Sequence, residues 1–197
     1  MIPEVLYIHG FASSSLSYKA RLLEEFFSNV GYYNIIHPNI PVAPKKAMNF
    51  IKEIITYNPI KLIIGSSLGG FYALAAHQDS HLPTVLINPA LEPHKTLKDF
   101  TGVVKKFNTE DFFIWTEDHV KQLQDIYFSL NFNNFDQDKL YFYLSKNDEF
   151  IDHSNIPNLF PKAHIKFFDN CRHRFDKFEL ILPEILDIYI KYTNPQA

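Results

Sequence analysis

Ser67 stands between two glycines in the pattern G-x-S-x-G, with Gly65 two residues before it and Gly69 two residues after it. An apolar run at 60–64 ends at the first glycine, and a helix-like stretch at 68–77 follows at once. This is the pattern of a nucleophile elbow, a tight strand-to-helix turn that projects the serine hydroxyl clear of the backbone. A chain with six glycines and eleven serines in 197 residues shows the pattern by chance about once in a hundred. The alternative is a plain tight turn with an incidental serine.

A nucleophilic serine needs a base, because its hydroxyl reacts poorly at neutral pH, and the base needs an orienting carboxylate. The expected chain order is serine, acid, histidine. His173 follows the last predicted strand and is our candidate base, although alone it would pass for a surface-loop histidine. Asp148 follows the preceding strand and is our candidate acid. Asp152 is the alternative acid, and Glu149 competes only if its loop twists differently.

The other ligand-type and nucleophilic side chains fit structural roles better. His9 lies at a strand end, where its ring is expected to brace the neighbouring loop, whereas His164 precedes its strand at the wrong end. His153 is too near the proposed acid loop to serve as base. Cys171 lies on no elbow, so we interpret it as a small residue that packs the histidine loop. No complete metal-ligand motif is present, and we expect neither a metal nor a cofactor.

An acyl-transfer site also needs two backbone donors for the developing oxyanion. Leu68, directly after the candidate nucleophile, supplies one N–H group. The loop at 9–12 follows the first buried strand, and Gly10 lets it turn sharply, so the N–H of Phe11 is the expected second donor. The Phe11 ring lies either beside the acyl group or in the core under the loop.

Composition and charge restrict the class of protein. The 197 residues suit one domain, and 46% hydrophobic with 16% aromatic residues is a globular composition. A formal net charge of −3 without a long basic run favours neither nucleic acid nor an anionic membrane surface. The single cysteine rules out an internal disulfide and suits a reducing compartment. We expect neither a signal peptide nor a membrane span, and therefore a cytoplasmic protein.

The order of predicted elements indicates an α/β fold with a mostly parallel central sheet and helices on both faces. In such a sheet, reactive groups gather at the carboxyl ends of the strands. Between 91 and 137 the rhythm breaks, and we interpret this segment either as a cap-like insertion in the single 1–197 domain or as a crossover helix with a long loop. Residues 112–115 are a candidate strand or hairpin. The predicted strands are 5–8, 34–37, 60–64, 84–87, 140–144 and 165–168, and the predicted helices are 17–30, 47–57, 68–77, 117–130, 155–160 and 177–192.

The chain resembles the small bacterial esterases of the YqiA type (UPF0227-like), which belong to the α/β-hydrolase superfamily. The resemblance spans nearly the whole chain, although the part around 107–115 departs from the family pattern. It implies an α/β-hydrolase fold and esterase activity on acyl esters or thioesters, and its Ser-Asp-His triad falls on Ser67, Asp148 and His173. The likeness is carried by Leu6-Tyr7-Ile8-His9-Gly10-Phe11 with Ser13-Ser14, Gly65-Ser66-Ser67-Leu68-Gly69-Gly70-Phe71-Tyr72-Ala73, Ile87-Asn88-Pro89-Ala90, the Asn147-Asp148-Glu149 loop and the His173 loop.

The sequence thus predicts a serine hydrolase that cleaves small-molecule acyl esters or thioesters through an acyl-enzyme. The alternative from another class is a catalytically silent α/β-hydrolase fold that binds a partner or a small apolar ligand, because fold alone does not establish activity. An acyltransferase or peptidase on the same triad is a nearer alternative. The sequence leaves open the choice of ester or thioester, the acyl-chain length and the oligomeric state.

Overall fold

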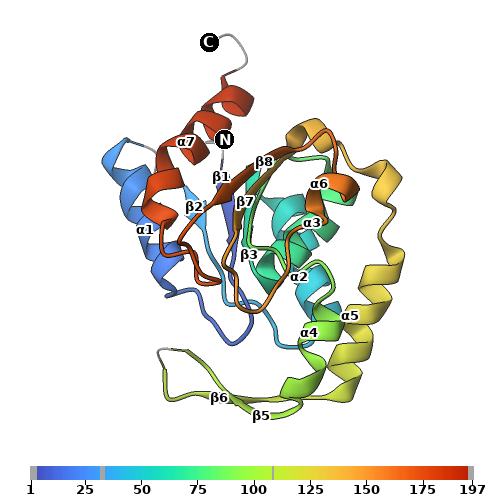
Figure 1. The fold of residues 1–197 in the computed structure, drawn as a ribbon. Helices are drawn as coiled ribbons and strands as arrows, with labels where there is room; N and C mark the ends of the chain where they lie inside the picture. Colours follow the sequence, from blue (N-terminus) through green and yellow to red (C-terminus); the bar gives the residue numbers. More distant parts are fainter. Residues whose placement is uncertain (1–3, 32–33, 108, 195–197) are drawn as a thin grey trace.

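The computed structural model describes residues 4–31, 34–107 and 109–194, and within them a six-stranded sheet forms the centre of the fold (Figure 1). The strand order is β2-β1-β3-β4-β7-β8, and every neighbouring pair is parallel. All four residues of β4 and all six of β7 are buried, as expected for strands covered on both faces. The strands are β1 (Glu4–Ile8), β2 (Ile35–Ile36), β3 (Ile60–Ser66), β4 (Thr84–Ile87), β7 (Leu140–Ser145) and β8 (His164–Phe168).

Helices cover both faces of the sheet and create two hydrophobic cores (Figure 1). The pair α1 (Tyr18–Asn29) and α7 (Phe178–Thr193) packs on one face, where Val5 and Tyr7 of β1 point. The opposite face is covered by α2 (Pro44–Tyr57), α3 (Leu68–Ser80) and α5 (Glu117–Ser129). The short elements are α4 (Pro93–Thr96), α6 (Ile156–Leu159), η1 (Lys98–Phe100), η2 (Phe132–Asn134) and η3 (Gln137–Lys139).

The predicted α/β class is confirmed, and each predicted strand and helix is present, most of them with shifts at their ends and β4 with none. Ser17 caps α1 by accepting a hydrogen bond from the Ala20 N–H group. The helix α2 begins three residues before its predicted start, because Pro44 occupies the first helical turn, where proline needs no N–H partner. The elbow strand β3 continues to Ser66, so Ser67 follows the strand directly.

The 91–137 segment contains a two-stranded antiparallel hairpin, β5 (Gly102–Lys105) with β6 (Phe112–Trp115). The prediction of a strand or hairpin at 112–115 is confirmed. Figure 1 shows the hairpin beyond the carboxyl ends of the central strands. Edge-to-face contacts join the Phe11 ring to Phe113 and Trp115, with centroids 5.5 and 5.0 Å apart. The hairpin therefore packs on the loop that follows β1, whereas its role as a cap stays a prediction.

The close approach of α3 to β1 depends on Gly69. A Cβ atom there would lie 2.1 Å from the Ile8 carbonyl oxygen, which belongs to the backbone of a central strand. Gly69→Ala is therefore expected to lower the free energy of unfolding by about 3 kcal/mol, measured by urea denaturation. The matched control is Gly31→Ala, because a Cβ there meets no atom within 4 Å and only the positive φ of +88° is strained. Equal losses in the two variants would contradict the proposed clash.

Candidate active site

Ser67 lies on a strained turn between β3 and α3. Its φ of 55° and ψ of −120° place a non-glycine residue in a rarely populated region, as a nucleophile elbow requires. Two backbone hydrogen bonds fix the turn against the end of β4: the Ser67 N–H donates to the Ile87 carbonyl, and the Ala90 N–H donates to the Ser67 carbonyl, both at 3.0 Å. The turn is thus held from outside its own sequence.

The structure brings Ser67, His173 and Asp148 together in one hydrogen-bonded relay. The distance from Ser67 Oγ to His173 Nε2 is 3.0 Å, and that from His173 Nδ1 to Asp148 Oδ2 is 2.8 Å. A neutral imidazole that donates through Nδ1–H to the carboxylate accepts the serine hydroxyl proton through Nε2. The arrangement can therefore generate a serine nucleophile.

Asp148 is held as a carboxylate by donors on both oxygens. Its Oδ1 accepts the Phe150 and Ile151 N–H groups at 2.9 Å each, and its Oδ2 accepts His153 Nε2–H at 2.9 Å besides His173. Burial acts to raise the Asp148 pKa, but the hydrogen bonds from His153 and His173 outweigh it and hold the pKa well below its usual range. The alternative acid, Asp152, instead accepts the Ser154 N–H group.

His153 is a site residue that the sequence reasoning missed. Its side chain is 2% exposed, and its Nε2 reaches the same carboxylate oxygen as His173. Its buried Nδ1 has no hydrogen-bond partner in the part of the chain that the structure describes. The Nε2 contact therefore makes His153 a second imidazole partner of the Asp148 carboxylate, beside His173. The only signal in the sequence was its position five residues after Asp148.

Asn88 is a second missed residue and positions the His173 loop. It is 1% exposed and follows β4 with a positive φ of 42°. Its Nδ2 group donates to the carbonyls of Arg172 and His173 at 3.2 and 3.1 Å, and its Oδ1 accepts the Ser145 N–H at 2.7 Å. The Asn-Pro pair at a strand end is part of the family resemblance, but its sequence does not indicate this role.

Glu149, the other carboxylate considered as the acid, accepts the His173 backbone N–H at 3.0 Å.

The two expected oxyanion donors are the N–H group of the residue after Ser67 and that of Phe11 in the loop after β1. Leu68 is the first residue of α3, so its N–H group has no acceptor within the helix. The Phe11 N–H group has no hydrogen-bond partner among the described residues. A Cβ on Gly10 would lie 3.7 Å from Ser67 Oγ, so the loop after β1 packs directly against the hydroxyl. Neither N–H group has a backbone acceptor among the described residues, and their role as oxyanion donors stays a prediction.

The family model of UPF0227, described as an uncharacterised protein family, matches residues 4–190 of the chain. The chain belongs to the UPF0227 family. This match covers the elbow, the acid loop and the histidine loop together.

Solved structures similar to this UPF0227 chain share its fold at low sequence identity. Est1E from Butyrivibrio proteoclasticus has a TM-score of 0.70 at 13% identity over 97% of this chain and 88% of that one. The mouse α/β-hydrolase domain-containing protein 10 has a TM-score of 0.71 at 16% identity over 97% and 91%. A metagenome-derived lipolytic enzyme (LipS or LipT) has a TM-score of 0.68 at 17% identity over 96% and 94%. The fold of the chain is that of the α/β-hydrolase superfamily.

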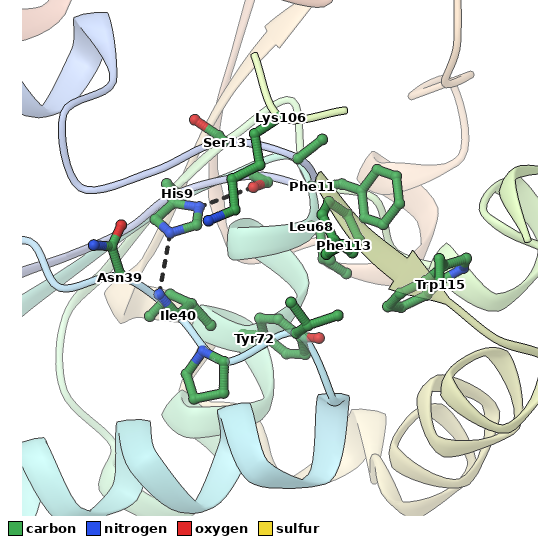
Figure 2. A pocket seen from close by; sticks show the side chains of 14 residues that line it. His9, Phe11, Ser13, Asn39, Ile40, Leu68, Tyr72, Lys106, Phe113 and Trp115 are labelled. Atoms are coloured by element: carbon green, nitrogen blue, oxygen red, sulfur yellow. Dashed lines mark hydrogen bonds between the residues drawn. The ribbon is translucent and has the colours of Figure 1, made fainter. Parts of the chain in front are cut away.

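His9 and Cys171 have the structural roles expected of them in this UPF0227 chain. His9 donates from Nδ1 to the Gly10 carbonyl at 2.9 Å and accepts the Ile40 N–H at Nε2 at 3.1 Å (Figure 2). Burial lowers the His9 pKa, which favours this neutral brace between two loops. Cys171 is completely buried in the core under the histidine loop, and burial raises the pKa of its thiol.

His77 and His81 form an H-x-x-x-H pair, a spacing that is also found in metal sites. The His77 Nδ1–H group donates a hydrogen bond to the Leu82 carbonyl at 2.7 Å. No group of three or more potential metal ligands occurs within the described ranges. A pair alone does not make a metal site.

None of the described helices is both long and apolar enough to cross a membrane.

Two cavities flank the relay of the UPF0227 site. A small one of about 70 Å³ lies on the side of Phe11 and Leu68, and the ring of Tyr72 lines it (Figure 2). A larger one of about 630 Å³ is lined by Ala90 and Phe150, among others. Phe150 stands edge-on to His173, with ring centroids 5.4 Å apart. The larger cavity therefore lies next to Phe150, which contacts His173, and the smaller one lies next to Leu68, which follows Ser67.

Proposed function

We propose that this protein is a serine hydrolase that cleaves carboxylic ester or thioester bonds through an acyl-enzyme on Ser67. The observation that carries the proposal is the continuous relay at the elbow, with 3.0 Å from Ser67 Oγ to His173 Nε2 and 2.8 Å from His173 Nδ1 to Asp148 Oδ2. Nucleophile, base and orienting acid stand within hydrogen-bond reach of one another, as acyl transfer requires.

In the first half-reaction, Ser67 Oγ attacks the substrate carbonyl carbon while His173 Nε2 takes the hydroxyl proton. The carbonyl oxygen becomes an oxyanion, which the N–H groups of Leu68 and Phe11 stabilise. His173 then gives its proton to the leaving oxygen or sulfur, and the bond to that atom breaks. The product is an acyl group esterified to Ser67 and a free alcohol or thiol.

In the second half-reaction, water attacks the acyl-enzyme carbonyl and gives a proton to His173, which returns it to Ser67 Oγ as the acid leaves. Asp148 holds the imidazole in the tautomer that both halves need and stabilises the transient imidazolium. Its depressed pKa keeps it charged throughout. The same relay serves an ester or a thioester.

The comparisons support this proposal at the level of chemistry. The similar structures include esterases and lipases, and one structure of Est1E holds ferulic acid. Those are properties of the named proteins. For this chain they favour a small-molecule acyl substrate over a peptide.

The proposal is tested by labelling the folded protein with a fluorophosphonate, which modifies activated serines. We expect one adduct per chain, mapped by mass spectrometry to Ser67 and lost in Ser67→Ala. Ser66→Ala is the matched control and should retain the label, because Ser66 ends β3 and belongs to no part of the relay. An adduct that persists in Ser67→Ala would contradict the proposal. No adduct on folded wild type, together with no hydrolysis of nitrophenyl esters, would favour the silent binding protein.

A further inference from the structure

The small cavity that Phe11 and Leu68 line contains a polar group without a hydrogen-bond partner among the described residues. Tyr72 of α3 is 2% exposed and lines this cavity together with Phe11, Leu68, Phe113 and Trp115. Its hydroxyl has no hydrogen-bond partner in the described part of the chain. In Figure 2 the hydroxyl points away from His9, toward the Trp115 side. The hydroxyl oxygen is not among the fully buried atoms that lack a partner, so it opens on the cavity, where an acceptor on a ligand can hydrogen-bond to it.

The ligand group that reaches this cavity follows from the direction of catalysis. His173 must deliver its proton to the leaving atom, so the leaving group extends toward His173 and Phe150. The larger cavity of about 630 Å³ lies on that side. The oxyanion faces the N–H groups of Phe11 and Leu68, and the acyl substituent takes the remaining direction, away from His173, on the side where the small cavity lies. The small cavity is therefore placed for the acyl group.

The size of the small cavity limits the acyl group. A dry cavity of about 150 Å³ accommodates benzene, which has six carbon atoms. The cavity here is about 70 Å³, which leaves room for three or four non-hydrogen atoms. This volume favours a short acyl group, whereas the larger cavity accommodates a bulky leaving group.

We propose that the cavity is an acyl subsite for short acyl groups that carry an uncharged oxygen near the third carbon, which hydrogen-bonds to the Tyr72 hydroxyl. This inference rests on the proposed hydrolase function for the identity of the acyl side. Burial raises the Tyr72 pKa, so the hydroxyl stays protonated and serves as a donor to a hydroxyl or keto oxygen. Phe113 and Trp115 supply apolar contacts around it.

Lys106 offers a second kind of polar contact in this cavity, an ion pair with a negatively charged substrate group. Its ammonium lies near His9, at the other end of the cavity from the Tyr72 hydroxyl (Figure 2). Asp111 lies 3.9 Å from it, a long ion pair. A substrate that prefers this end would carry a terminal carboxylate, so a succinyl ester belongs in the test.

The test compares two isosteric substrates, 4-nitrophenyl 3-hydroxybutanoate and 4-nitrophenyl 3-methylbutanoate, in which a hydroxyl replaces a methyl group. The wild type is expected to favour the hydroxy ester by about fivefold in kcat/KM, the usual contribution of one neutral hydrogen bond. Tyr72→Phe should bring this ratio to about one or invert it. The control is Tyr57→Phe, because Tyr57 is 81% exposed on α2, and it should keep the wild-type ratio. Thermal unfolding checks that each variant is folded.

The test also includes 4-nitrophenyl hexanoate, a longer acyl ester. Three outcomes would overturn the subsite: an unchanged ratio in Tyr72→Phe, a higher kcat/KM for the hexanoate than for the 3-hydroxybutanoate, or a higher kcat/KM for the succinyl ester. In each case Ser67-dependent turnover of the esters would leave the hydrolase proposal standing. Binding of free 3-hydroxybutanoate and 3-methylbutanoate, followed by ligand-observed NMR, tests the subsite without turnover. Stronger binding of the hydroxy acid to wild type than to Tyr72→Phe supports it, and equal binding overturns it.

Discussion

Replacement of Ser67 by alanine is expected to lower kcat for short nitrophenyl esters by at least about 10⁴-fold. The variant lacks the only atom that can form the acyl-enzyme, while the oxyanion donors and the cavities remain. Alanine has the same backbone restriction at φ 55° as serine, so the strain of the elbow is unchanged. Steady-state release of nitrophenol measures kcat, and circular dichroism together with urea unfolding shows whether the variant is folded.

The control for this prediction is again Ser66→Ala, which leaves the relay intact. A Ser67→Ala protein that keeps more than about a hundredth of the wild-type kcat would show that hydrolysis proceeds without this hydroxyl. The nucleophile proposed above would then be wrong, even if the fold and the relay geometry are correct.

Asp148→Asn is expected to lower kcat by about 10⁴-fold, because an amide can present a donor where His173 needs an acceptor and so favours the wrong imidazole tautomer. The same change should cost about 2 kcal/mol of unfolding free energy, since charge-assisted hydrogen bonds from His153, His173 and the loop backbone lose their carboxylate. Nitrophenyl ester kinetics and urea unfolding measure the two effects separately.

The stability effect of Asp148 has a definite dependence on pH. An aspartate in an unfolded chain has a pKa of about 3.9. Because the folded pKa lies below that value, the carboxylate stabilises the fold above it, and this contribution is lost as the pH falls through the folded pKa. The difference in unfolding free energy between wild type and Asp148→Asn should be constant above about pH 5 and shrink below about pH 4.

Asp152→Asn is the matched control for this prediction. Asp152 caps its own loop at Ser154 and does not reach His173, so the variant should keep kcat within about twofold. Full activity in Asp148→Asn together with loss in Asp152→Asn would assign the acid to the other carboxylate. That result would require a different conformation of the acid loop during catalysis.

The elbow was predictable because its chemistry is local. Gly65, Ser67 and Gly69 must lie within one tight turn, and the glycine requirement is visible in five consecutive residues. His173 and Asp148 were reached through topology, since parallel strands deliver the residues after their carboxyl ends to one edge of the sheet. Both kinds of inference need only the order of elements.

The supporting residues were not predictable in the same way. Asn88 and His153 act through side-chain directions and long-range contacts, with Asn88 bonded across 84 and 85 residues of chain. Sequence spacing carries no information about which carbonyl a side-chain amide will meet. The strand β5 was missed because the central strands were recognised by longer apolar runs, whereas β5 has only two apolar residues between Gly102 and Lys105. It is an exposed strand, with Val103 74% exposed.

The short segment that follows β4 determines the spacing between nucleophile and base. Ile87 and Ala90 bind the backbone of Ser67, and between them Asn88 binds the carbonyls of Arg172 and His173. The nucleophile turn and the His173 loop, which are far apart in the chain, are thus both hydrogen-bonded to residues 87–90. A substitution that displaces this segment is therefore expected to displace both the hydroxyl and the imidazole, because it holds the backbone of both loops.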